Sequence, residues 1–313
     1  MSEPKQDLAE RVAVVTGGAR GIGLAVARAL GARGARLVLA DAGLDPAGHP
    51  ENPDAASDAV AALARDGIVA IPFAEVLGTR ETAERLVAFA TEHMGAVDIL
   101  VNNAAILQDR MVWNLTPAAW DEVLAVNLST AFYLLRAVAG NMRARRFGRV
   151  LNIVSSAGLI GNVGQANYGA AKGGLVALSR VAALDLARYG VTVNAIAPFA
   201  HTRITDLIVP HHPAVAEYLA TVRGVASPDS VGALAAYLAT EESQVYTGQV
   251  FGVRGGEVFL FSAPRPVGVQ RSPAGTLTDH DLAAAFARWE ERGLLTPLET
   301  DLEYMSRPLP PDE

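Results

Sequence analysis

Two side chains with acid–base chemistry, Tyr168 and Lys172, are four residues apart in a stretch with a helical pattern. At this spacing both project from one face of a helix. A lysine ammonium beside a phenol lowers the pKa of the phenol, which would make Tyr168 a usable acid or base near neutral pH. Because the same spacing is common on helix surfaces, the pair gains significance only from polar residues placed near it by the fold.

Such residues follow two predicted strands. Ser155 ends one apolar run, and Asn102 and Asn103 follow another. The carboxyl ends of parallel strands share one edge of a sheet, which is where ligands bind. Asn127 lies inside a helical stretch, where a side-chain amide is mildly disfavoured. Together these positions predict a polar site at the carboxyl edge of a sheet.

A glycine-rich segment connects the first predicted strand to the first predicted helix. Glycines allow a tight turn and let a pyrophosphate approach the backbone, while the helix N-terminus offers free amides and a positive dipole. Such a string alone is compatible with a plain tight turn, but the strand–turn–helix context favours a dinucleotide-binding loop. Its predicted cofactor contacts are Gly17, Arg20, Gly21, Ile22 and Gly23.

An acidic residue, Asp41, stands at the end of the second predicted strand, 18 residues after Gly23. A carboxylate there can accept hydrogen bonds from both ribose hydroxyls and repels a 2′-phosphate, although a plain turn aspartate is the alternative. Arg20 favours the opposite preference, because a guanidinium near the ribose can pair with a 2′-phosphate. We expect NAD as the cofactor, with NADP as the alternative.

Short apolar runs alternate with longer helical patterns over most of the chain. Apolar runs separated by helices are typical of a parallel sheet that is covered on both faces. The sequence therefore predicts an α/β fold with a single Rossmann-type, doubly wound sheet. The predicted strands are Val12–Thr16, Arg36–Ala40, Ile68–Ile71, Ile99–Val101, Val150–Val154 and Thr192–Ile196, and the predicted helices are Arg20–Ala32, Asp54–Arg65, Thr79–His93, Thr116–Met142 and Gln165–Tyr189.

Three segments depart from this alternation. Ala42–Pro53 is rich in turn-forming residues and is predicted to be an inserted loop. His201–Gly224 is irregular and could cover a site. Beyond Ser262 the alternation stops. We therefore expect a catalytic dinucleotide-binding domain at residues 1–262 and a C-terminal extension at 263–313, made of a linker, one helix over Asp279–Arg292 and a Pro-rich tail.

Composition narrows the possible function classes. Of 313 residues, 50% are apolar, and the net charge is −7. The apolar share excludes a disordered chain, and the acidic balance argues against a nucleic-acid partner. The absence of cysteine excludes thiolate chemistry, and the adjacent His211 and His212 lack suitably spaced partners, so no metal is expected. With no apolar run near the ~18 residues of a membrane span and no secretory segment, we expect a cytoplasmic protein without a membrane partner.

The combined motifs resemble those of the short-chain dehydrogenase/reductase family over about residues 10–260. The matching positions are Thr16-Gly17-x3-Gly21-x-Gly23, Asn102-Asn103-Ala104, Asn127, Ser155 and Tyr168-x3-Lys172. The resemblance implies that Tyr168 exchanges a proton with the substrate oxygen, which Ser155 hydrogen-bonds. It implies that Lys172 lowers the tyrosine pKa and binds the nicotinamide ribose. It also implies that Asn127 holds a water in a proton relay.

The resemblance implies further cofactor contacts, some at positions where this chain departs from the family pattern. Glu75-Val76 stands where the family usually has Asp-Val facing adenine, and Asn103 would contact the adenosine ribose region. The usual Asn-Asn-Ala-Gly ends in Ala105 after Ala104, and the usual Pro-Gly is Pro198-Phe199. The extra methyl of Ala105 puts the local packing around the cofactor in doubt rather than the activity.

The inserted loop after Asp41, Leu107-Gln108-Asp109-Arg110 and the segment from Gly161 to Tyr168 resemble one branch of the family. This branch is the (3R)-hydroxyacyl-CoA dehydrogenase domain of peroxisomal multifunctional enzymes and its bacterial relatives. The Gly164-Gln165-Ala166-Asn167-Tyr168 run is shared with 3-oxoacyl-acyl-carrier-protein reductases. The resemblance thus implies an NAD(P)-dependent oxidoreductase that interconverts a secondary alcohol and a ketone, with a CoA or acyl-carrier thioester as a possible substrate. Hydroxysteroids or other bulky alcohols remain alternatives, as does a non-catalytic dinucleotide-binding module. The family also implies a homodimer or homotetramer.

Overall fold

The protein, as a computed structural model, is described at residues 6–200, 213, 215–216, 219–220, 226–272, 275–307 and 309. It divides into two compact units, of which the first comprises Met1–Phe261 with Thr300–Glu313 and the second is Ser262–Glu299. Most of the irregular segment His201–Gly224, including His211 and His212, lies outside the described residues. So does most of the predicted Pro-rich tail.

The first unit is built on an eight-stranded sheet with the order β3-β2-β1-β4-β5-β6-β7-β8. All neighbouring strands are parallel except β7 and β8, which are antiparallel. The strand order reverses direction at the neighbours β1 and β4, which creates the crevice where doubly wound sheets bind ligands. The strands are β1 (Val12–Thr16), β2 (Arg36–Ala40), β3 (Ala70–Phe73), β4 (Ile99–Asn102), β5 (Gly148–Ile153), β6 (Val191–Phe199), β7 (Val250–Arg254) and β8 (Glu257–Leu260).

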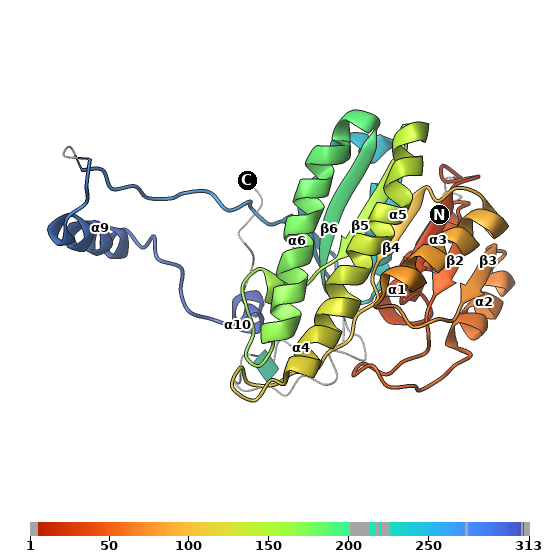
Figure 1. Ribbon diagram of the computed structural model, residues 1–313, viewed down its shortest axis with the longest axis horizontal. Coiled ribbons are helices and arrows are strands. Elements are labelled where there is room, and N and C mark those ends of the chain that lie inside the picture. The colour runs from red at the N-terminus through yellow and green to blue at the C-terminus, as the bar shows by residue number, and fades with distance from the viewer. Residues whose placement is uncertain are drawn as a thin grey trace. The chain divides into compact units, whose positions relative to one another are not determined.

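Helices cover both faces of this sheet, and α5 and α6 lie in front of it in Figure 1. Alternate residues of β1 enter opposite cores, with Ala13 and Val15 in one and Val12 and Val14 in the other. This alternation explains why the strand is apolar throughout. Within the described residues, the first unit contains the helices α1 (Gly21–Ala32), α2 (Ala55–Arg65), α3 (Arg80–Met94), α4 (Pro117–Leu124), α5 (Thr130–Arg145), α6 (Ala166–Leu186), α8 (Asp229–Leu238) and α10 (Asp301–Met305).

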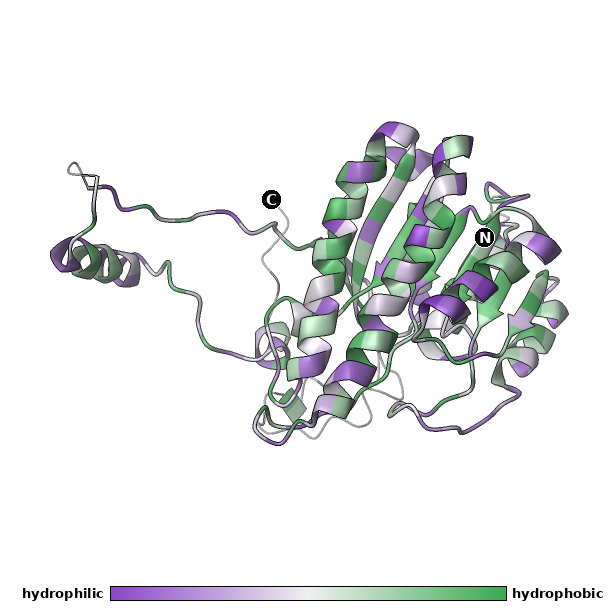
Figure 2. Cartoon of the chain, viewed as in Figure 1, coloured by the Kyte–Doolittle hydropathy of each residue, from purple (hydrophilic) through white to green (hydrophobic). Residues whose placement is uncertain are grey.

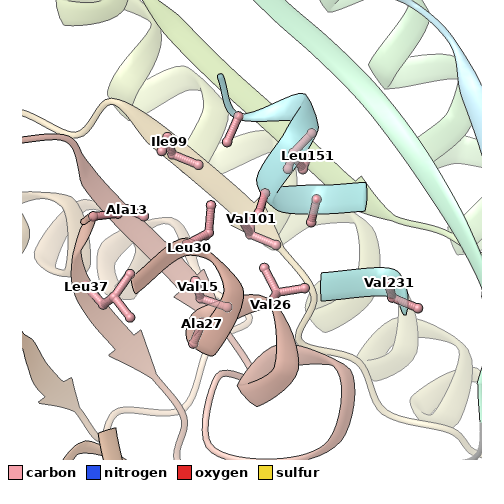
Figure 3. Close-up of a cluster of buried hydrophobic side chains, with 14 of the residues drawn as sticks. Ala13, Val15, Val26, Ala27, Leu30, Leu37, Ile99, Val101, Leu151 and Val231 are labelled. Atoms are coloured by element: carbon pink, nitrogen blue, oxygen red, sulfur yellow. The ribbon is translucent and has the colours of Figure 1, made fainter. Parts of the chain in front are cut away.

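The core beneath α1 fixes the position of that helix. Figure 3 shows Val26 and Leu30 of α1 pointing toward Val15 and Val101 of the sheet, and these residues belong to one buried cluster. Figure 2 shows the same pattern at the scale of the chain, with hydrophobic strands and helices that are hydrophilic in part. Burial of the apolar stripe therefore holds α1, and the glycine loop before it, against the sheet.

One helical run, Pro117–Arg145, is long and apolar enough to span a bilayer by length and composition alone. It comprises α4, a π-helical segment at Ala125–Ser129 and α5. Leu134, Val138 and Met142 of this run are buried in the second core with strand residues. A core helix of a doubly wound fold passes the same test, and the packing on the sheet accounts for this composition.

The predicted doubly wound α/β fold is confirmed, with differences in detail. β3 begins at Ala70 instead of Ile68, because Ile68 packs under α1 against Gly31 rather than joining the sheet. α8, β7 and β8 at the carboxyl end of the domain were not predicted from the sequence. The predicted extension also divides differently, because Met305 of α10 is buried in a core of the first unit.

The second unit contains α9 (Asp279–Glu291), which agrees with the predicted helix over Asp279–Arg292. Its N-terminus carries a capping box formed by Thr278 and Asp281. On the same helix, the rings of Phe286 and Trp289 make an edge contact with centroids 5.3 Å apart.

Candidate active site

The glycine loop holds its shape through glycines that no other residue could replace without a shift. Gly17 has φ +61°, and a Cβ on Gly23 would lie 2.0 Å from the carbonyl oxygen of Gly17. The side-chain amide of Asn103 donates to the carbonyl oxygens of Thr16 (2.9 Å) and Gly17 (3.0 Å). α1 begins at Gly21, so its first amides face the end of the loop without helical partners. This cradle fits a pyrophosphate approaching the backbone.

Asp41 is held at the end of β2 by backbone donors. One carboxylate oxygen accepts from the amide of Ala19 (3.0 Å) and the other from the amide of Gly43 (2.9 Å). Arg20, which precedes α1, donates to Glu51 (2.5 Å) and to the carbonyl oxygen of Leu44 (2.9 Å). Glu51 of the inserted loop thus neutralises Arg20, the basic side chain expected near the ribose.

A cavity of about 480 Å³ extends along these residues. Val76, a predicted cofactor contact, is 56% exposed and is not among the residues that line this cavity, whereas its neighbour Leu77 is. Glu75 lines the cavity as well, and it accepts hydrogen bonds from Arg85. Leu77 and the inserted-loop residues were missed by the sequence analysis. The described lining residues are Gly17, Arg20, Gly21, Ile22, Ala40, Asp41, Ala42, Leu44, Asp45, Pro46, Glu75, Leu77, Asn103, Ala104, Ala105, Ile106 and Val126.

Ser155 follows β5 and caps a short 3-10 turn at Ser156–Gly158, accepting a hydrogen bond from the amide of Ala157 (3.2 Å). The turn packs closely on α6, because a Cβ on Gly158 would lie 2.5 Å from the backbone nitrogen of Gly173. This close approach requires glycine, and it places Ser155 near enough to Tyr168 to lower the pKa of the phenol.

Tyr168 and Lys172 lie one turn apart on α6. Lys172 is 2% exposed, and its amino group donates to the carbonyl oxygen of Ile153 (2.7 Å). Burial lowers the pKa of Lys172 to about 8. Burial also raises the pKa of Tyr168 to about 12, against the opposing effect of the hydrogen bond with Ser155. The expectation of a lowered phenol pKa is therefore not met in this structure, because loss of solvation outweighs the favourable contacts.

Asn127 lies in the π-helical segment between α4 and α5 and is 2% exposed. Its amide oxygen accepts from the backbone amide of Ile106 (2.9 Å), and its amide nitrogen donates to the carbonyl oxygen of the same residue (2.9 Å). Both polar ends of the side chain are therefore engaged with the segment that follows β4. Asn127 fixes the segment that lines the cofactor cavity.

A second cavity, of about 950 Å³, adjoins the first and shares Ile22, Asn103 and Ala105 with it. Ser155, Tyr168, Lys172 and Pro198 line this cavity, so the structure brings together the predicted catalytic residues other than Asn127. Two residues that the sequence analysis missed, Asp301 and Leu302 of α10, line it as well. The capping box formed by Thr300 and Glu303 is a sequence signal that could have revealed this helix.

No group of three or more His, Cys, Asp or Glu side chains that could hold a metal ion occurs within the described part of the chain. At the wall of the second cavity, Tyr168, Lys172 and Ser155 provide a phenol, an amine and a hydroxyl. These groups can move a proton and hydrogen-bond an oxygen beside the dinucleotide cavity. That combination suits hydride transfer to or from a carbon that bears an oxygen.

Comparison with known proteins identifies the class. The family model described as short chain dehydrogenase matches residues 11–210. The chain is 41% identical over 266 residues to the hydroxyacyl-CoA dehydrogenase ChsB1 of Mycobacterium tuberculosis, with 82% of this chain and 81% of the relative covered. It is 35% identical to a 3-oxoacyl-[acyl-carrier-protein] reductase of Synechocystis, with 81% and 99% covered. Peroxisomal multifunctional enzymes are among the further relatives.

Comparison with solved structures indicates the same family. A crystal structure of a short chain dehydrogenase from Mycobacterium avium matches with a TM-score of 0.77 and 34% identity, and covers 93% of this chain and 97% of that chain. Fold and site define an NAD(P)-dependent oxidoreductase that acts on CH–OH groups. The chain belongs to the short-chain dehydrogenase/reductase family, so the prediction of this family is confirmed and a non-catalytic module is not supported.

Proposed function

We propose that the protein oxidises a 3-hydroxyacyl thioester to the 3-oxoacyl thioester with NAD⁺, and catalyses the reverse reaction with NADH. The observation that carries this proposal is the meeting of Ser155, Tyr168 and Lys172 in one cavity that adjoins the glycine-loop cavity. The similarity to a hydroxyacyl-CoA dehydrogenase and to a 3-oxoacyl-[acyl-carrier-protein] reductase supports the thioester class.

The side chains act on the proton and the substrate oxygen. A nicotinamide dinucleotide held by the glycine loop and Asp41 would supply the acceptor for the hydride. The phenolate of Tyr168 takes the hydroxyl proton, and Ser155 hydrogen-bonds the same oxygen. Lys172 stabilises the phenolate through its ammonium charge, which the low polarity of the buried site strengthens. In the reverse direction the phenol of Tyr168 returns the proton to the carbonyl oxygen.

The charges around the first cavity support NAD rather than NADP. Asp41 and Asp45 line it, and the backbone hydrogen bond from His49 holds the pKa of Asp45 below its ordinary value, whereas Glu75 in the same lining is paired with Arg85. Arg20 is paired with Glu51. A 2′-phosphate would therefore meet carboxylates and a guanidinium whose charge is already balanced.

Arg110 supports a carrier with phosphate groups. This residue is exposed and lines the second cavity, where its guanidinium donates only to the neighbouring carbonyl oxygen of Asp109 among the described contacts (2.7 Å). A guanidinium at a cavity mouth can pair with the phosphates of CoA or of a phosphopantetheine arm. The acyl chain would then enter the cavity toward Tyr168.

The second cavity is large enough for a second class of candidate substrate. About 950 Å³ is at the upper end of the usual range for ligand sites, so a hydroxysteroid or another bulky alcohol would also fit. A panel of 3-hydroxyacyl-CoA thioesters, hydroxysteroids and simple secondary alcohols, assayed with NAD⁺, separates the two. The proposal predicts the highest kcat/KM for a thioester, and a steroid with the highest kcat/KM would contradict it.

The variant Arg110→Ala tests whether this arginine binds the phosphates of the carrier. We expect the variant to raise KM for an acyl-CoA about tenfold without changing KM for a simple alcohol, because only the carrier phosphates meet Arg110. Arg65→Ala on α2, an exposed arginine at the carboxyl end of that helix, is the matched control. Equal effects of the two variants on acyl-CoA would contradict the role of Arg110.

We also propose that copies of the chain associate through α5 and α6. Phe132 on α5 is 46% exposed, and Val181 and Leu184 on α6 are 56% and 82% exposed. Apolar side chains of this size on neighbouring helices favour a protein interface. Light scattering that gives the mass of a dimer or tetramer would support this association, and a monomer at assay concentration would contradict it.

A further inference from the structure

α10 contacts the turn that follows the active-site serine. Asp301, the first residue of α10, donates its backbone amide to the carbonyl oxygen of Gly161 (2.8 Å). Its carboxylate accepts a hydrogen bond of 2.5 Å from the hydroxyl of Ser156. Ser156 directly follows Ser155, so a residue near the end of the chain contacts the neighbour of the active-site hydroxyl.

This contact lies in the interior. Asp301 is 4% exposed and Ser156 is 5% exposed. On the same helix Met305 is fully buried, and Arg254 of β7 donates to its carbonyl oxygen (2.8 Å). α10 is therefore packed into the first unit by apolar and polar contacts, and Asp301 is held in place by them.

The position of Ser155 depends on the turn that follows it. The hydroxyl of Ser155 accepts from the amide of Ala157, within the turn that begins at Ser156. Gly158 fixes the far end of this turn against α6. Asp301 fixes its near end, because the hydroxyl of Ser156 has the buried carboxylate as its partner. The turn is thus held at both ends, and Ser155 and Tyr168 line the same cavity.

We propose that Asp301 is a positioning residue for the active site. By accepting the hydrogen bond from Ser156, it keeps Ser155 in place next to Tyr168. This inference rests on the proposed roles of Ser155 and Tyr168. It assigns to the carboxyl end of the chain a part in turnover that is separate from any role in binding the dinucleotide, because Asp301 lines the second cavity and is not among the residues of the first.

The charge of Asp301 is part of this arrangement. Its second oxygen is buried without a partner among the described residues, and burial raises the pKa of this carboxyl. An ionised Asp301 would raise the pKa of Tyr168, as would Asp109 from the segment after β4. Lys172, Asp109, Arg110, Glu122 and His49 line the same cavity as Asp301, and Glu303 lies on the same helix. A neutral residue 301 is therefore the form that favours ionisation of Tyr168.

The variants Asp301→Asn and Asp301→Ala distinguish the effect of the hydrogen bond with Ser156 from the effect of the carboxylate charge. Asp301→Asn keeps an acceptor for Ser156, whereas Asp301→Ala and Ser156→Ala remove the hydrogen bond. We expect each alanine variant to lower kcat about tenfold with an unchanged Kd for NADH, and the double variant to be no slower than either single one. Asp301→Asn should keep kcat within about threefold of the wild type. Asp279→Asn, at the first position of the exposed α9, is the matched control.

The ionisation of Tyr168 gives a readout that does not need turnover. The phenolate absorbance of each variant, taken as the difference from its Tyr168→Phe counterpart, should show a lower pKa of Tyr168 in Asp301→Asn than in the wild type. If Asp301→Ala does not fold, Asp301→Asn and Ser156→Ala still decide the question.

Several results would overturn the inference. One is an unchanged kcat in Ser156→Ala. Another is a lower melting temperature of the variants with kcat and the pKa of Tyr168 unmoved, which would indicate a structural role alone. A third is an Asp301→Asn variant as slow as Asp301→Ala. Failure of the proposed function looks different, because the wild type itself would then fail to oxidise every alcohol in the panel while the phenolate titration still reports on Asp301.

Discussion

Lys172 and Tyr168 face each other across one turn of α6, with the amino group of Lys172 5.6 Å from the centre of the Tyr168 ring. Burial displaces both pKa values in the direction that disfavours charge, toward about 8 for Lys172 and about 12 for Tyr168. The form needed for alcohol oxidation has both groups charged. Its population is set by the two titrations together, so the pair must be treated as a coupled system.

The coupling predicts the shape of a pH profile. The phenolate fraction of Tyr168 rises about tenfold per pH unit below its pKa, whereas the ammonium fraction of Lys172 falls above about pH 8. We expect kcat/KM for oxidation to rise with pH up to about 8 and then to level off. Reduction needs the neutral phenol and should be flat up to the same point. An oxidation rate that is constant or falls as pH approaches 8 would contradict this account.

Asp109 offers a second test of the same pair, because its negative charge raises the pKa of Tyr168. Asp109→Asn should therefore increase the oxidation rate at neutral pH a few-fold while leaving the break in the profile near pH 8. Asp185→Asn, at an exposed position on the same helix as Tyr168, is the control. Slower oxidation in Asp109→Asn, without loss of folding, would argue against an electrostatic effect on Tyr168.

Lys172 also links folding to pH. Its pKa is lowered from 10.5 to about 8 in the folded protein, so between these values the unfolded chain binds the additional proton. The free energy of unfolding must then rise with pH over this interval. In Lys172→Met that rise should disappear, as measured by urea denaturation at several pH values. Lys172 and Lys5 are the two lysines of the chain, so Lys5→Met is the matched control and should keep the rise.

The glycine loop is tested by adding a single methyl group. A Cβ on Gly23 would lie 2.0 Å from the backbone oxygen of Gly17, so Gly23→Ala must displace the loop. We expect NADH affinity to fall at least about a hundredfold, which corresponds to about 2.8 kcal/mol. Gly140→Ala in α5 is the control, since a Cβ there has no neighbour within 4 Å among the described residues. Binding by Gly23→Ala within threefold of the wild type would exclude this loop as the pyrophosphate site.

The pairing of Arg20 with Glu51 makes a prediction about cofactor choice. Asp41→Ser removes the carboxylate at the end of β2, and Glu51→Gln releases the guanidinium of Arg20. Each change should tighten NADP⁺ binding about tenfold with a smaller effect on NAD⁺. Glu84→Gln, which breaks a similar exposed pair with Arg136, is the control and should change neither affinity. A wild type that binds NADP⁺ more tightly than NAD⁺ would contradict the proposed preference.

The sequence and the structure agree best where the chemistry depends on local spacing. The glycine loop, Asp41 and the pair Tyr168 and Lys172 are each set by a short pattern inside or beside one element. The alternation of apolar runs with helical stretches was sufficient to predict a doubly wound sheet. Local patterns of this kind report on burial and backbone conformation, which explains their success.

The contacts that the sequence could not predict join distant segments. Nothing in the local pattern around Asp301 indicates that its carboxylate meets Ser156, or that α10 returns to the first unit. The pairing of Arg20 with Glu51 depends on the path of the inserted loop. The raised pKa of Tyr168 follows from the burial that the whole fold produces, whereas the spacing of Tyr168 and Lys172 alone suggested a lowered one.

We propose that Tyr168 transfers the proton in an NAD-dependent oxidation of a 3-hydroxyacyl thioester. The most direct measurement is NADH formation from NAD⁺ and a 3-hydroxyacyl-CoA by the wild type, by Tyr168→Phe and by Tyr189→Phe, whose hydroxyl is bonded to Arg143 and Arg188 away from both cavities. We predict turnover by the wild type and Tyr189→Phe, and at least a thousandfold lower kcat in Tyr168→Phe, about 4 kcal/mol of barrier, with NADH affinity retained. Oxidation by Tyr168→Phe at the wild-type rate would contradict the account.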